Sequence, residues 1–409
     1  MLSVYEGFFS GGARIVHSDV VLGLREGGQH HRVLSVHGEV HREATRQRME
    51  DDACYRRLTA ADVGVTSLGR TFGTAGLDPA VFTGPELADT ARATADADVI
   101  LSLKEQPLAL LRQAGLPRRP VVVCLHRSDP ENQGRALDDL KAAIADGTVA
   151  AAVCCAESTR AAYEAAGVPS ALLHVIPNGV DLIRFRPDAA RRLAVRTALD
   201  IPAAAPVVVF AARYDGMKNV PLFLAAARAW LAAVPDGHVL MCGAGMTAAN
   251  PGLDADIATA FGDEDHGRLH RLGVRQDMEA VYAAADVVAL TSAWGEAAPL
   301  CLIEGMMCGA VPVATDVGDS AAIVAGHGLV TPPAPDAVAA AWTEAVANRA
   351  AYTPALTASR ERFSRTRMIA SYAALIDRVY AGAPLSLTSP EDSPNNTNNT
   401  NSPNNTNYG

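Results

Sequence analysis

The chain has 409 residues and a mass of 42.7 kDa, which at roughly 100 to 200 residues per domain suggests two domains and excludes a small disulfide-stapled module. Apolar residues make up 49% of it and charged residues 20%, the ordinary balance of a globular protein. Its net charge of -10 argues against a basic surface for nucleic acid, so we expect no nucleic-acid partner.

The longest apolar stretches stop well short of the roughly 18 residues that a membrane helix needs. The amino terminus lacks a basic run followed by an apolar core, so we expect no secretory signal, no transmembrane segment and a cytoplasmic location. Seven cysteines lie mostly inside apolar runs and form no Cys-x-x-Cys pair. This pattern is typical of buried small hydrophobes and predicts no metal site.

Short apolar runs bounded by turn residues alternate with stretches of helical period along the whole chain. They lie at 31–38, 63–68, 99–103, 121–126 and 151–156 in the first half, and at 207–213, 238–243, 287–292, 311–315 and 328–332 in the second. Strands without polar alternation are covered on both faces, so the pattern predicts βαβ units with parallel sheets. We therefore expect an α/β protein with two doubly wound, Rossmann-like domains.

The order of these segments predicts the domain boundaries. We place the amino-terminal domain at 1–182 and the carboxyl-terminal domain at 183–365, with a helix at 366–382 that crosses back to the first domain. The remainder, 383–409, is dominated by Asn, Ser, Thr and Pro. Such a segment buries too little apolar surface to offset its ordering entropy, which predicts a disordered tail.

The segment TSAWGEAAPLCLIEGMMCGAVPVAT, residues 291–315, is the densest signal for chemistry. Pro299 is expected to open a helix as its first residue, and Gly309 to lie just past its end. The free amides of that helix would then face the carboxyl edge of a parallel sheet, where phosphates bind. Glu296 in the preceding loop and Glu304 in the helix are candidate acceptors for sugar hydroxyls. The alternative is two solvated acids, but Glu304 interrupts an apolar run, where an unpaired carboxylate is costly.

A second signal is VVVFAARYDGMKN, residues 207–219. Arg213 ends a buried run and Lys218 follows it across a turn, which brings two cations to one sheet edge. Only three of the 35 basic residues are lysine, so this one is more informative than most. The pair suits a diphosphate, with arginine as a planar fork and lysine as a point charge, although an ordinary charged loop is the alternative.

Glycines mark two further turns. Gly243, Gly245 and Ala248 mimic the dinucleotide fingerprint G-x-G-x-x-G/A, but they lie in the middle of the chain, so we favour a tight turn beside a nucleotide over an NAD site. Gly11 and Gly12 follow a short first strand, where paired glycines permit a close approach of backbone to ligand or form a plain turn.

Four more polar residues lie at the ends of apolar runs in the first half. His126 ends the run VVVCLH and precedes Arg127 and Asp129, while Lys104 ends the run before it. A lone histidine is more often structural than functional. Lys104 is a candidate for acceptor contact or equally for a helix cap.

Together these segments resemble the retaining glycosyltransferases of family 4, which have the GT-B fold of two facing domains and an interdomain cleft. The matching pieces are GGARIV, VVVCLH, HVIPNGVDLIRFRP, FAARYDGMKN, LHRLGVRQDMEAVYAAADVVALTS and GEAAPLCLIEGMMCGAVPVAT. The resemblance covers about residues 1 to 380 and is most specific in the second half.

The resemblance implies roles for the carboxyl-terminal residues. Glu296 would hold hydroxyls of the donor sugar, Glu304 the donor ribose, and Arg213 with Lys218 the diphosphate. The donor-binding set would also include Gly243, Val274, Arg275, Pro299 and Leu300, with the backbone of Val274 and Arg275 meeting the base.

In the amino-terminal domain the resemblance implies that Gly12 approaches the phosphate or the acceptor, and that His126 faces the donor sugar. The acceptor candidates are Lys104, Arg127 and Asp129. Two departures from the family pattern concern the donor sugar: Ala297-Ala298 stand where Gly-Phe is usual, and a glutamate expected near Ala322 is absent.

The implied function is transfer of a sugar, with retention, from a UDP- or GDP-sugar to an acceptor hydroxyl or thiol, without a metal or other cofactor. Two alternatives stay open: a GT-B nucleotide-sugar epimerase, and a nucleotide-sugar-binding protein without turnover. Residues 1–180 carry 18 basic and 22 acidic side chains, a balance of -4 that slightly favours a small soluble acceptor over a lipid-linked one.

Overall fold

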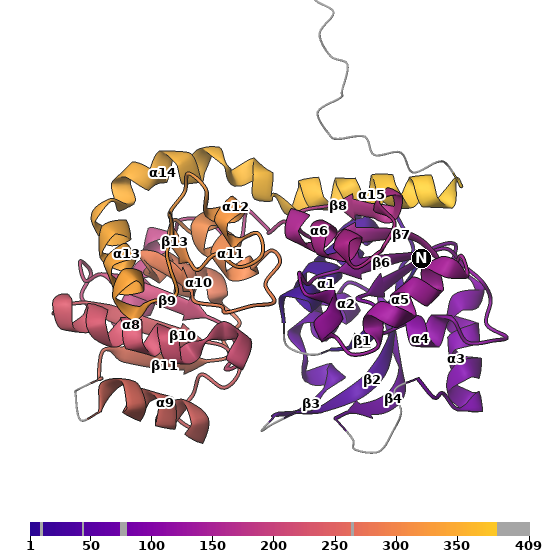
Figure 1. The fold of residues 1–409 in the computed structure, drawn as a ribbon, viewed down its shortest axis with the longest axis horizontal. Helices are drawn as coiled ribbons and strands as arrows, with labels where there is room; N and C mark the ends of the chain where they lie inside the picture. The colour runs from indigo at the N-terminus through magenta and orange to yellow at the C-terminus, as the bar shows by residue number, and fades with distance from the viewer. Residues whose placement is uncertain (9–10, 43–44, 74–79, 263–265, 383–409) are drawn as a thin grey trace, which may run out of the picture.

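The structure is a computed structural model that describes residues 1–8, 11–42, 45–73, 80–262 and 266–382 (Figure 1). Two separate, mainly parallel sheets, each covered by helices, form the two halves of the molecule. This confirms the predicted α/β class with two doubly wound domains. The predicted tail at 383–409 lies outside the described residues.

The amino-terminal sheet has the strand order β3-β2-β1-β5-β6-β7-β8, and β4 also pairs with β2. Its strands are β1 (Leu2–Gly7), β2 (Arg32–Arg42), β3 (Thr45–Arg48), β4 (Gly64–Phe72), β5 (Ile100–Leu103), β6 (Val121–Leu125), β7 (Val149–Cys154) and β8 (Leu173–Val175). Every pairing is parallel except that of β2 with β3. All five residues of β6 are buried, because helices cover both faces of the sheet.

The helices of this half are α1 (Gly12–Glu26), α2 (Ala53–Ala60), α3 (Gly84–Ala95), α4 (Leu108–Leu111), α5 (Ala136–Ala145) and α6 (Glu157–Ala165). The start of α3 shows how the sequence sets a helix boundary. The Thr83 hydroxyl accepts from the Glu86 amide and the Glu86 carboxylate accepts from the Thr83 amide, a reciprocal capping box.

The carboxyl-terminal sheet has six parallel strands in the order β11-β10-β9-β12-β13-β14. They are β9 (Val207–Ala211), β10 (His238–Cys242), β11 (Leu269–Gly273), β12 (Val287–Leu290), β13 (Val311–Ala314) and β14 (Leu329–Val330). The helices are α7 (Ala189–Ala198), α8 (Val220–Ala233), α9 (Pro251–Phe261), α10 (Met278–Ala284), α11 (Leu300–Met307), α12 (Ser320–Val324), α13 (Pro335–Ala347) and α14 (Arg349–Ala358).

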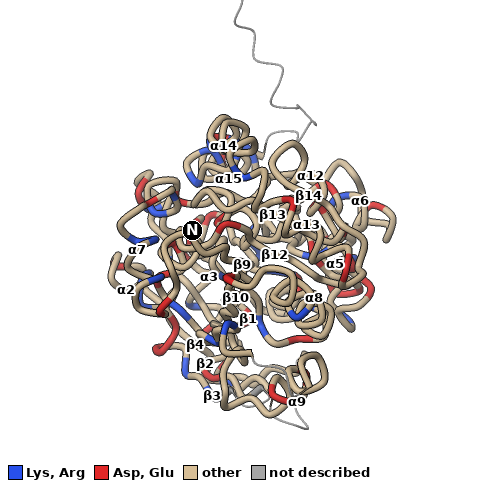
Figure 2. Tube along the Cα trace, turned by 90° about the vertical axis from the view of Figure 1, so that its left-hand side faces the viewer, with Lys and Arg blue, Asp and Glu red and all other residues tan. Residues whose placement is uncertain are grey.

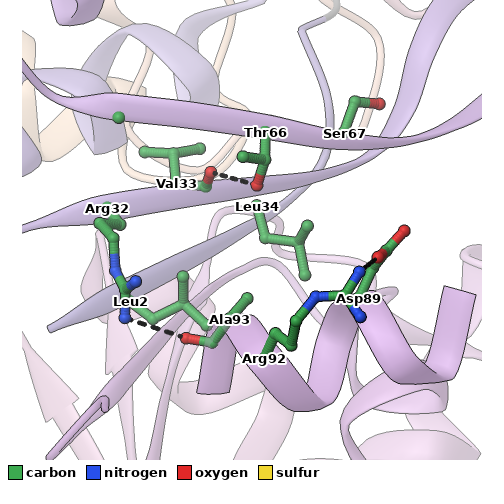
Figure 3. Close-up of a pocket in the computed structure, with 10 residues that line it drawn as sticks. Leu2, Arg32, Val33, Leu34, Thr66, Ser67, Asp89, Arg92 and Ala93 are labelled. Atoms are coloured by element: carbon green, nitrogen blue, oxygen red, sulfur yellow. Dashed lines mark hydrogen bonds and ion pairs between the residues drawn. The ribbon is translucent and has the colours of Figure 1, made fainter. Parts of the chain in front are cut away.

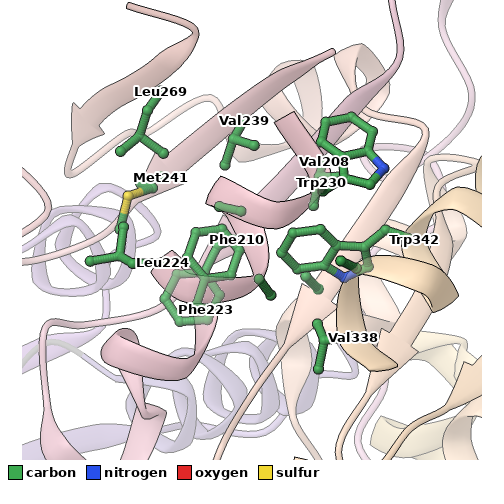
Figure 4. Close-up of a cluster of buried hydrophobic side chains, with 14 of the residues drawn as sticks. Val208, Phe210, Phe223, Leu224, Trp230, Val239, Met241, Leu269, Val338 and Trp342 are labelled. Carbon is green, nitrogen blue, oxygen red and sulfur yellow. The ribbon is translucent and has the colours of Figure 1, made fainter. Parts of the chain in front are cut away.

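Aromatic side chains fill the core on one face of this sheet (Figure 4). Phe210 of β9 stacks on Phe223 of α8 with 4.2 Å between ring centroids, and Trp342 of α13 lies 5.4 Å from Phe223. Trp230 and Trp342 meet edge to face at 6.2 Å. Each such pair adds about 0.5 to 1.5 kcal/mol to the burial of its area, so this cluster locks α8 and α13 onto the sheet.

The chain crosses between the two halves at two adjacent segments. Val180 forms a parallel bridge with Ser364, and a Cβ at Gly179 would lie 2.4 Å from the Ser364 carbonyl oxygen, so a larger residue would push the crossings apart. After the second crossing, α15 (Arg365–Tyr380) lies along the amino-terminal domain and packs against α1 (Figure 1). We keep the boundaries at 182 and 365 as proposed domain limits.

Strand order determines where each half can bind a ligand. In the first sheet β1 lies between β2 and β5, and in the second β9 lies between β10 and β12. The connections on the two sides of β1 and β9 leave in opposite directions, which opens a crevice at the carboxyl end of the strand. The loops that follow β1 and β9 are therefore the expected binding positions.

A buried carboxylate holds the second domain together at the opposite edge of its sheet. Asp286 is 6% exposed and accepts from the guanidinium groups of Arg192, Arg196 and Arg349 at 2.7, 3.0 and 2.7 Å. It also accepts from the backbone amide of Val207 at 2.9 Å. The side chain thus ties α7, α14 and the start of β9 to one point.

We expect Asp286→Ala to lower the free energy of unfolding by about 3 to 5 kcal/mol, because it leaves the buried Arg196 without its anionic partner. Urea unfolding followed by circular dichroism measures the change. Asp89→Ala, which removes an exposed pair with Arg92 on α3, is the matched control and should cost less than about 1 kcal/mol. Equal losses in the two variants would contradict this role of Asp286.

Candidate active site

The candidate site lies where the segment after β1 meets the segment after β12 across the two domains. Gly12 begins α1 directly after β1, and a Cβ on it would lie 3.3 Å from Cδ1 of Leu300 at the start of α11. Leu300 packs against the buried cores of both domains. The two predicted donor-binding residues are therefore in contact across the seam.

Lys218 and Glu296 form an ion pair at the centre of this seam. Lys218 ends the 3-10 turn η4 (Gly216–Lys218) after β9, and Glu296 follows β12, the neighbour of β9 in the sheet. The Lys218 Nζ donates to Oε1 of Glu296, and Ser292 Oγ donates to the same oxygen at 2.6 Å. Glu296 is 6% exposed, so these donors compensate a carboxylate that would otherwise be costly to bury.

Arg213 follows β9 in the same loop as Lys218 and remains partly open to solvent. Its side chain is 31% exposed and its Nη2 lies 3.2 Å from Oδ2 of Asp215. The other carboxylate oxygen of Asp215 accepts from the Met217 amide at 3.0 Å and so shapes the turn that leads to Lys218. Two cations and two carboxylates therefore share one sheet edge.

Helix α11 presents its amino terminus at the same edge without a side-chain cap and without an acidic residue in its first turn. The prediction that Pro299 is its first residue was wrong by one position. Pro299 is the N-cap, because its ψ of 115° is extended and only Leu300 enters the helix. Gly309 lies just past the end with a φ of +88°, as predicted.

Glu304 lies in the fifth position of α11 and is partly buried against α10. Burial raises the pKa of its carboxyl to about 7, and a hydrogen bond from the Tyr282 hydroxyl opposes that rise. Tyr282 is 1% exposed, and its own pKa is raised well above its ordinary value by burial. Glu304 therefore exchanges its proton near neutral pH.

The loop after β10 requires glycine at position 243. Gly243 has a φ of +133°, and a Cβ there would lie 2.0 Å from the carbonyl oxygen of Ala212, which follows β9. The close approach holds the ends of β9 and β10 together. Val274 is 62% exposed after β11, and the Arg275 guanidinium is held by Asp277 at 2.8 and 2.6 Å, so the side chain of Arg275 points to its own loop.

On the amino-terminal side, His126 follows β6 and Lys104 follows β5. The Nε2 atom of His126 is buried without a hydrogen-bond partner, and burial, with a smaller effect of the Lys104 charge, lowers the pKa of the ring to about 3. The imidazole is therefore neutral. Lys104 has a φ of +66°, a left-handed conformation that bends the chain at the sheet edge.

The two remaining acceptor candidates are bound to each other. Arg127 donates from Nε and Nη2 to the carboxylate of Asp129 at 2.7 and 2.6 Å. A Cβ at Gly295 would lie 3.0 Å from Nη2 of Arg127, so this pair lies against the loop that leads to Glu296. Further contacts across the seam that the sequence did not predict involve Ser128, Asn178 and Asp319.

A separate hollow of about 410 Å³ lies under α3 (Figure 3). Its wall includes the first residues of β1, β2 and β4, namely Leu2, Arg32 and Gly64. It therefore opens at the amino-terminal edge of the sheet, opposite the edge that carries the candidate site. Its rim carries the ion pair of Arg92 with Asp89.

Basic and acidic residues are interspersed over the described part of the chain in the side view (Figure 2). The described residues hold no group of three His, Cys, Asp or Glu side chains placed to bind a metal ion. Within them, no helix is long and apolar enough to cross a membrane.

Two family models match this chain, one in each half. Residues 10–184 match the family model "Glycosyltransferase Family 4", and residues 205–348 match "Glycosyl transferases group 1". The chain belongs to glycosyltransferase family 4. The two matched segments lie on the two sides of the seam, one in each domain.

Curated members of the family align with a part of this chain. A D-inositol 3-phosphate glycosyltransferase of Saccharomonospora viridis is 38% identical over 162 residues, which are 38% of this chain and 36% of the relative. The same-named protein of Salinispora tropica is 34% identical over 156 residues, which are 36% of this chain and 32% of the relative. The alignments thus span about a third of these relatives.

Solved structures share the whole fold at low identity. Anabaena HepE, crystallised with UDP and glucose, has a TM-score of 0.73 and 21% identity, covering 92% of this chain and 98% of its own. Sucrose-phosphate synthase of Thermosynechococcus elongatus has a TM-score of 0.67 and 19% identity, covering 93% of this chain and 99% of its own. This family 4 protein therefore has the GT-B fold.

The raised pKa of Glu304 predicts a pH-dependent stability. Burial raises it from 4.5 to about 7, so the folded protein holds this proton more tightly than the unfolded chain. The resulting stabilisation is fully present below pH 4.5 and is lost as the pH rises through about 7. We expect the melting temperature of Glu304→Gln to exceed that of the wild type by more at about pH 8 than at about pH 5. A constant difference in differential scanning fluorimetry would contradict it.

Proposed function

We propose that this protein is a retaining glycosyltransferase that moves a sugar from a nucleoside-diphosphate sugar to an acceptor hydroxyl or thiol. Membership of family 4 and the GT-B fold support this reaction class. The observation that carries the proposal is the ion pair of Lys218 with Glu296, which lies at the same sheet edge as Arg213 and the uncapped start of α11. A UDP- or GDP-sugar carries a diphosphate, which suits the cations and the helix amides, next to sugar hydroxyls, which suit Glu296.

The cations and the helix would act on the leaving group. When the bond between the sugar and the diphosphate breaks, negative charge grows on the phosphate oxygens. Arg213, Lys218 and the first amides of α11 would stabilise that charge from fixed positions, which lowers the barrier without a metal. With a diphosphate bound, Lys218 would share its charge between the phosphate and Glu296.

The carboxylates and the histidine would hold the sugar. Glu296 would accept from donor sugar hydroxyls and Glu304 from the donor ribose. The neutral ring of His126 offers an unpartnered Nε2 to a sugar hydroxyl from the opposite domain. The acceptor would attack on the face that the nucleotide leaves, and its proton would pass to the departing phosphate, while domain closure excludes water.

For the acceptor we propose a small polar molecule, with a lipid-linked acceptor as the alternative. The relatives' name contains D-inositol 3-phosphate. Only about a third of each relative aligns with this chain, so we do not assign that acceptor to it. The acidic balance of residues 1–180 supports an acceptor that arrives from solution. Lys104 is the acceptor candidate without an ion pair to another described residue, whereas Arg127 and Asp129 neutralise each other.

We expect Arg213→Ala to lower kcat by about 100-fold, because it removes one preorganised stabiliser of the leaving diphosphate. Release of nucleoside diphosphate in the presence of donor and acceptor measures the change. Arg271→Ala, which breaks an exposed pair with Asp254 in the same domain, is the control and should keep kcat within about twofold. A kcat of Arg213→Ala close to that of the wild type would refute this role.

A thermal-shift screen across UDP-, GDP-, ADP- and TDP-sugars identifies the donor, because a ligand at 100 times its Kd stabilises the fold by about 2.7 kcal/mol. Incubation with that donor alone separates the alternatives. A sugar isomerised without acceptor would indicate an epimerase. Binding without turnover across an acceptor panel would favour a non-catalytic nucleotide-sugar-binding protein.

A further inference from the structure

Helix α6 begins without a cap from its own neighbourhood. Its N-cap residue is Ala156, which has no side-chain acceptor, so the first amides of the helix need a partner from elsewhere. Asp319 supplies it from the other domain. The two oxygens of its carboxylate accept from the amides of Glu157 and Ser158 at 2.9 and 2.8 Å.

Asp319 is committed to this contact rather than to its own helix. It is the N-cap residue of α12, where an aspartate ordinarily accepts from the amides that follow it. Its side chain makes no such bond. The carboxylate instead lies at the positive end of the α6 dipole, where an anion is favoured. The carboxylate of Asp319 therefore caps α6 across the seam and leaves the start of α12 without a side-chain cap.

The same residue also fixes the loop that carries Glu296. The backbone amide of Asp319 donates to the carbonyl of Ala297 at 2.8 Å. Its neighbour Gly318 has a φ of +61°, and a Cβ there would lie 2.3 Å from the carbonyl oxygen of Glu296. The turn before α12 therefore packs directly against this loop.

The amino-terminal domain holds the carbonyls on either side. Ser128 Oγ donates to the carbonyl of Glu296, and Asn178 Nδ2 donates to the carbonyl of Ala298 at 3.0 Å. Three consecutive carbonyls of the Glu296 loop are thus held, two from the opposite domain and one by Asp319. The shape of the loop depends on the domains being closed.

We propose that Asp319 is a positioning residue that latches the two domains by capping α6, and that this latch sets Glu296 in its working geometry. The effect on turnover rests on the proposed function, whereas the cap itself does not. Opening the seam exposes the amides of α6 and releases the loop carbonyls together. The Asp319 latch therefore couples domain closure to the position of the loop.

Hydrogen exchange of the α6 amides tests the cap without any substrate. In Asp319→Ala we expect the amides of Glu157 and Ser158 to exchange about tenfold faster than in the wild type, the size of effect that follows loss of a capping bond. Asp188→Ala is the matched control, because Asp188 caps α7 within one domain, accepting from Arg191 at 3.0 Å. It should leave exchange in α6 unchanged. Unchanged exchange in Asp319→Ala would overturn the latch.

Steady-state kinetics test the positioning role. We expect Asp319→Ala to lower kcat about tenfold while the dissociation constant of the donor changes less than about twofold, since the diphosphate contacts stay in place. Asp319→Asn keeps an acceptor oxygen and should recover most of kcat, and Asp188→Ala should keep it. Faster exchange with an unchanged kcat would overturn the positioning role. If the wild-type protein transferred no sugar, the proposed function would be refuted. Hydrogen exchange would still decide whether Asp319 caps α6.

Discussion

The ion pair of Lys218 with Glu296 is the contact around which the rest of the site is arranged. It joins the ends of two neighbouring strands, β9 and β12, and Ser292 shares its carboxylate. Because Glu296 is buried, its charge requires both donors to stay in place. Its backbone carbonyl accepts from Ser128 of the amino-terminal domain. Glu296 therefore takes part in the ion pair through its side chain and in the contact between the domains through its backbone carbonyl.

Apolar packing provides the frame that keeps this arrangement rigid. Leu300 touches the buried cores of both domains, and Ala297 is buried against Cys155 and Ala156 across the seam. Small side chains on both sides allow the loop and α6 to approach closely. Beyond the seam, α15 returns to the first domain and packs on α1, where Ile369 fills the space that Gly23 leaves. The last helix therefore belongs to the core of the first domain.

The sequence predicted the parts of the fold and site that depend on local pattern. Each of the ten apolar runs overlaps a strand. Most of these strands are buried on both faces, which requires a continuous apolar run, whereas β4 and β14 are more exposed. Arg213, Lys218 and Glu296 follow such runs, and neighbouring parallel strands bring their carboxyl ends to one edge. Short strands such as β3 and β8 escaped prediction, since three or four residues carry too little pattern.

Contacts made by docking the two domains could not be predicted in this way. Asp319 and Glu157 are 162 residues apart, and nothing in the sequence near either one indicates the other. The nearest signal was the poor capping residue Ala156, which leaves the start of α6 unsatisfied. Pro299 was misplaced by one residue because a proline φ suits both the N-cap and the first helical position, and only ψ distinguishes them.

Calorimetric titration with nucleoside diphosphates tests the central claim that the seam beside the Lys218–Glu296 pair is a diphosphate site. The account predicts that one of UDP, GDP, ADP and TDP binds the wild type with one site per chain. It also predicts that Lys218→Ala weakens that binding by at least about tenfold, as expected for a lost charge-assisted contact. Failure of all four to bind, or equal affinity in the variant, would contradict the account.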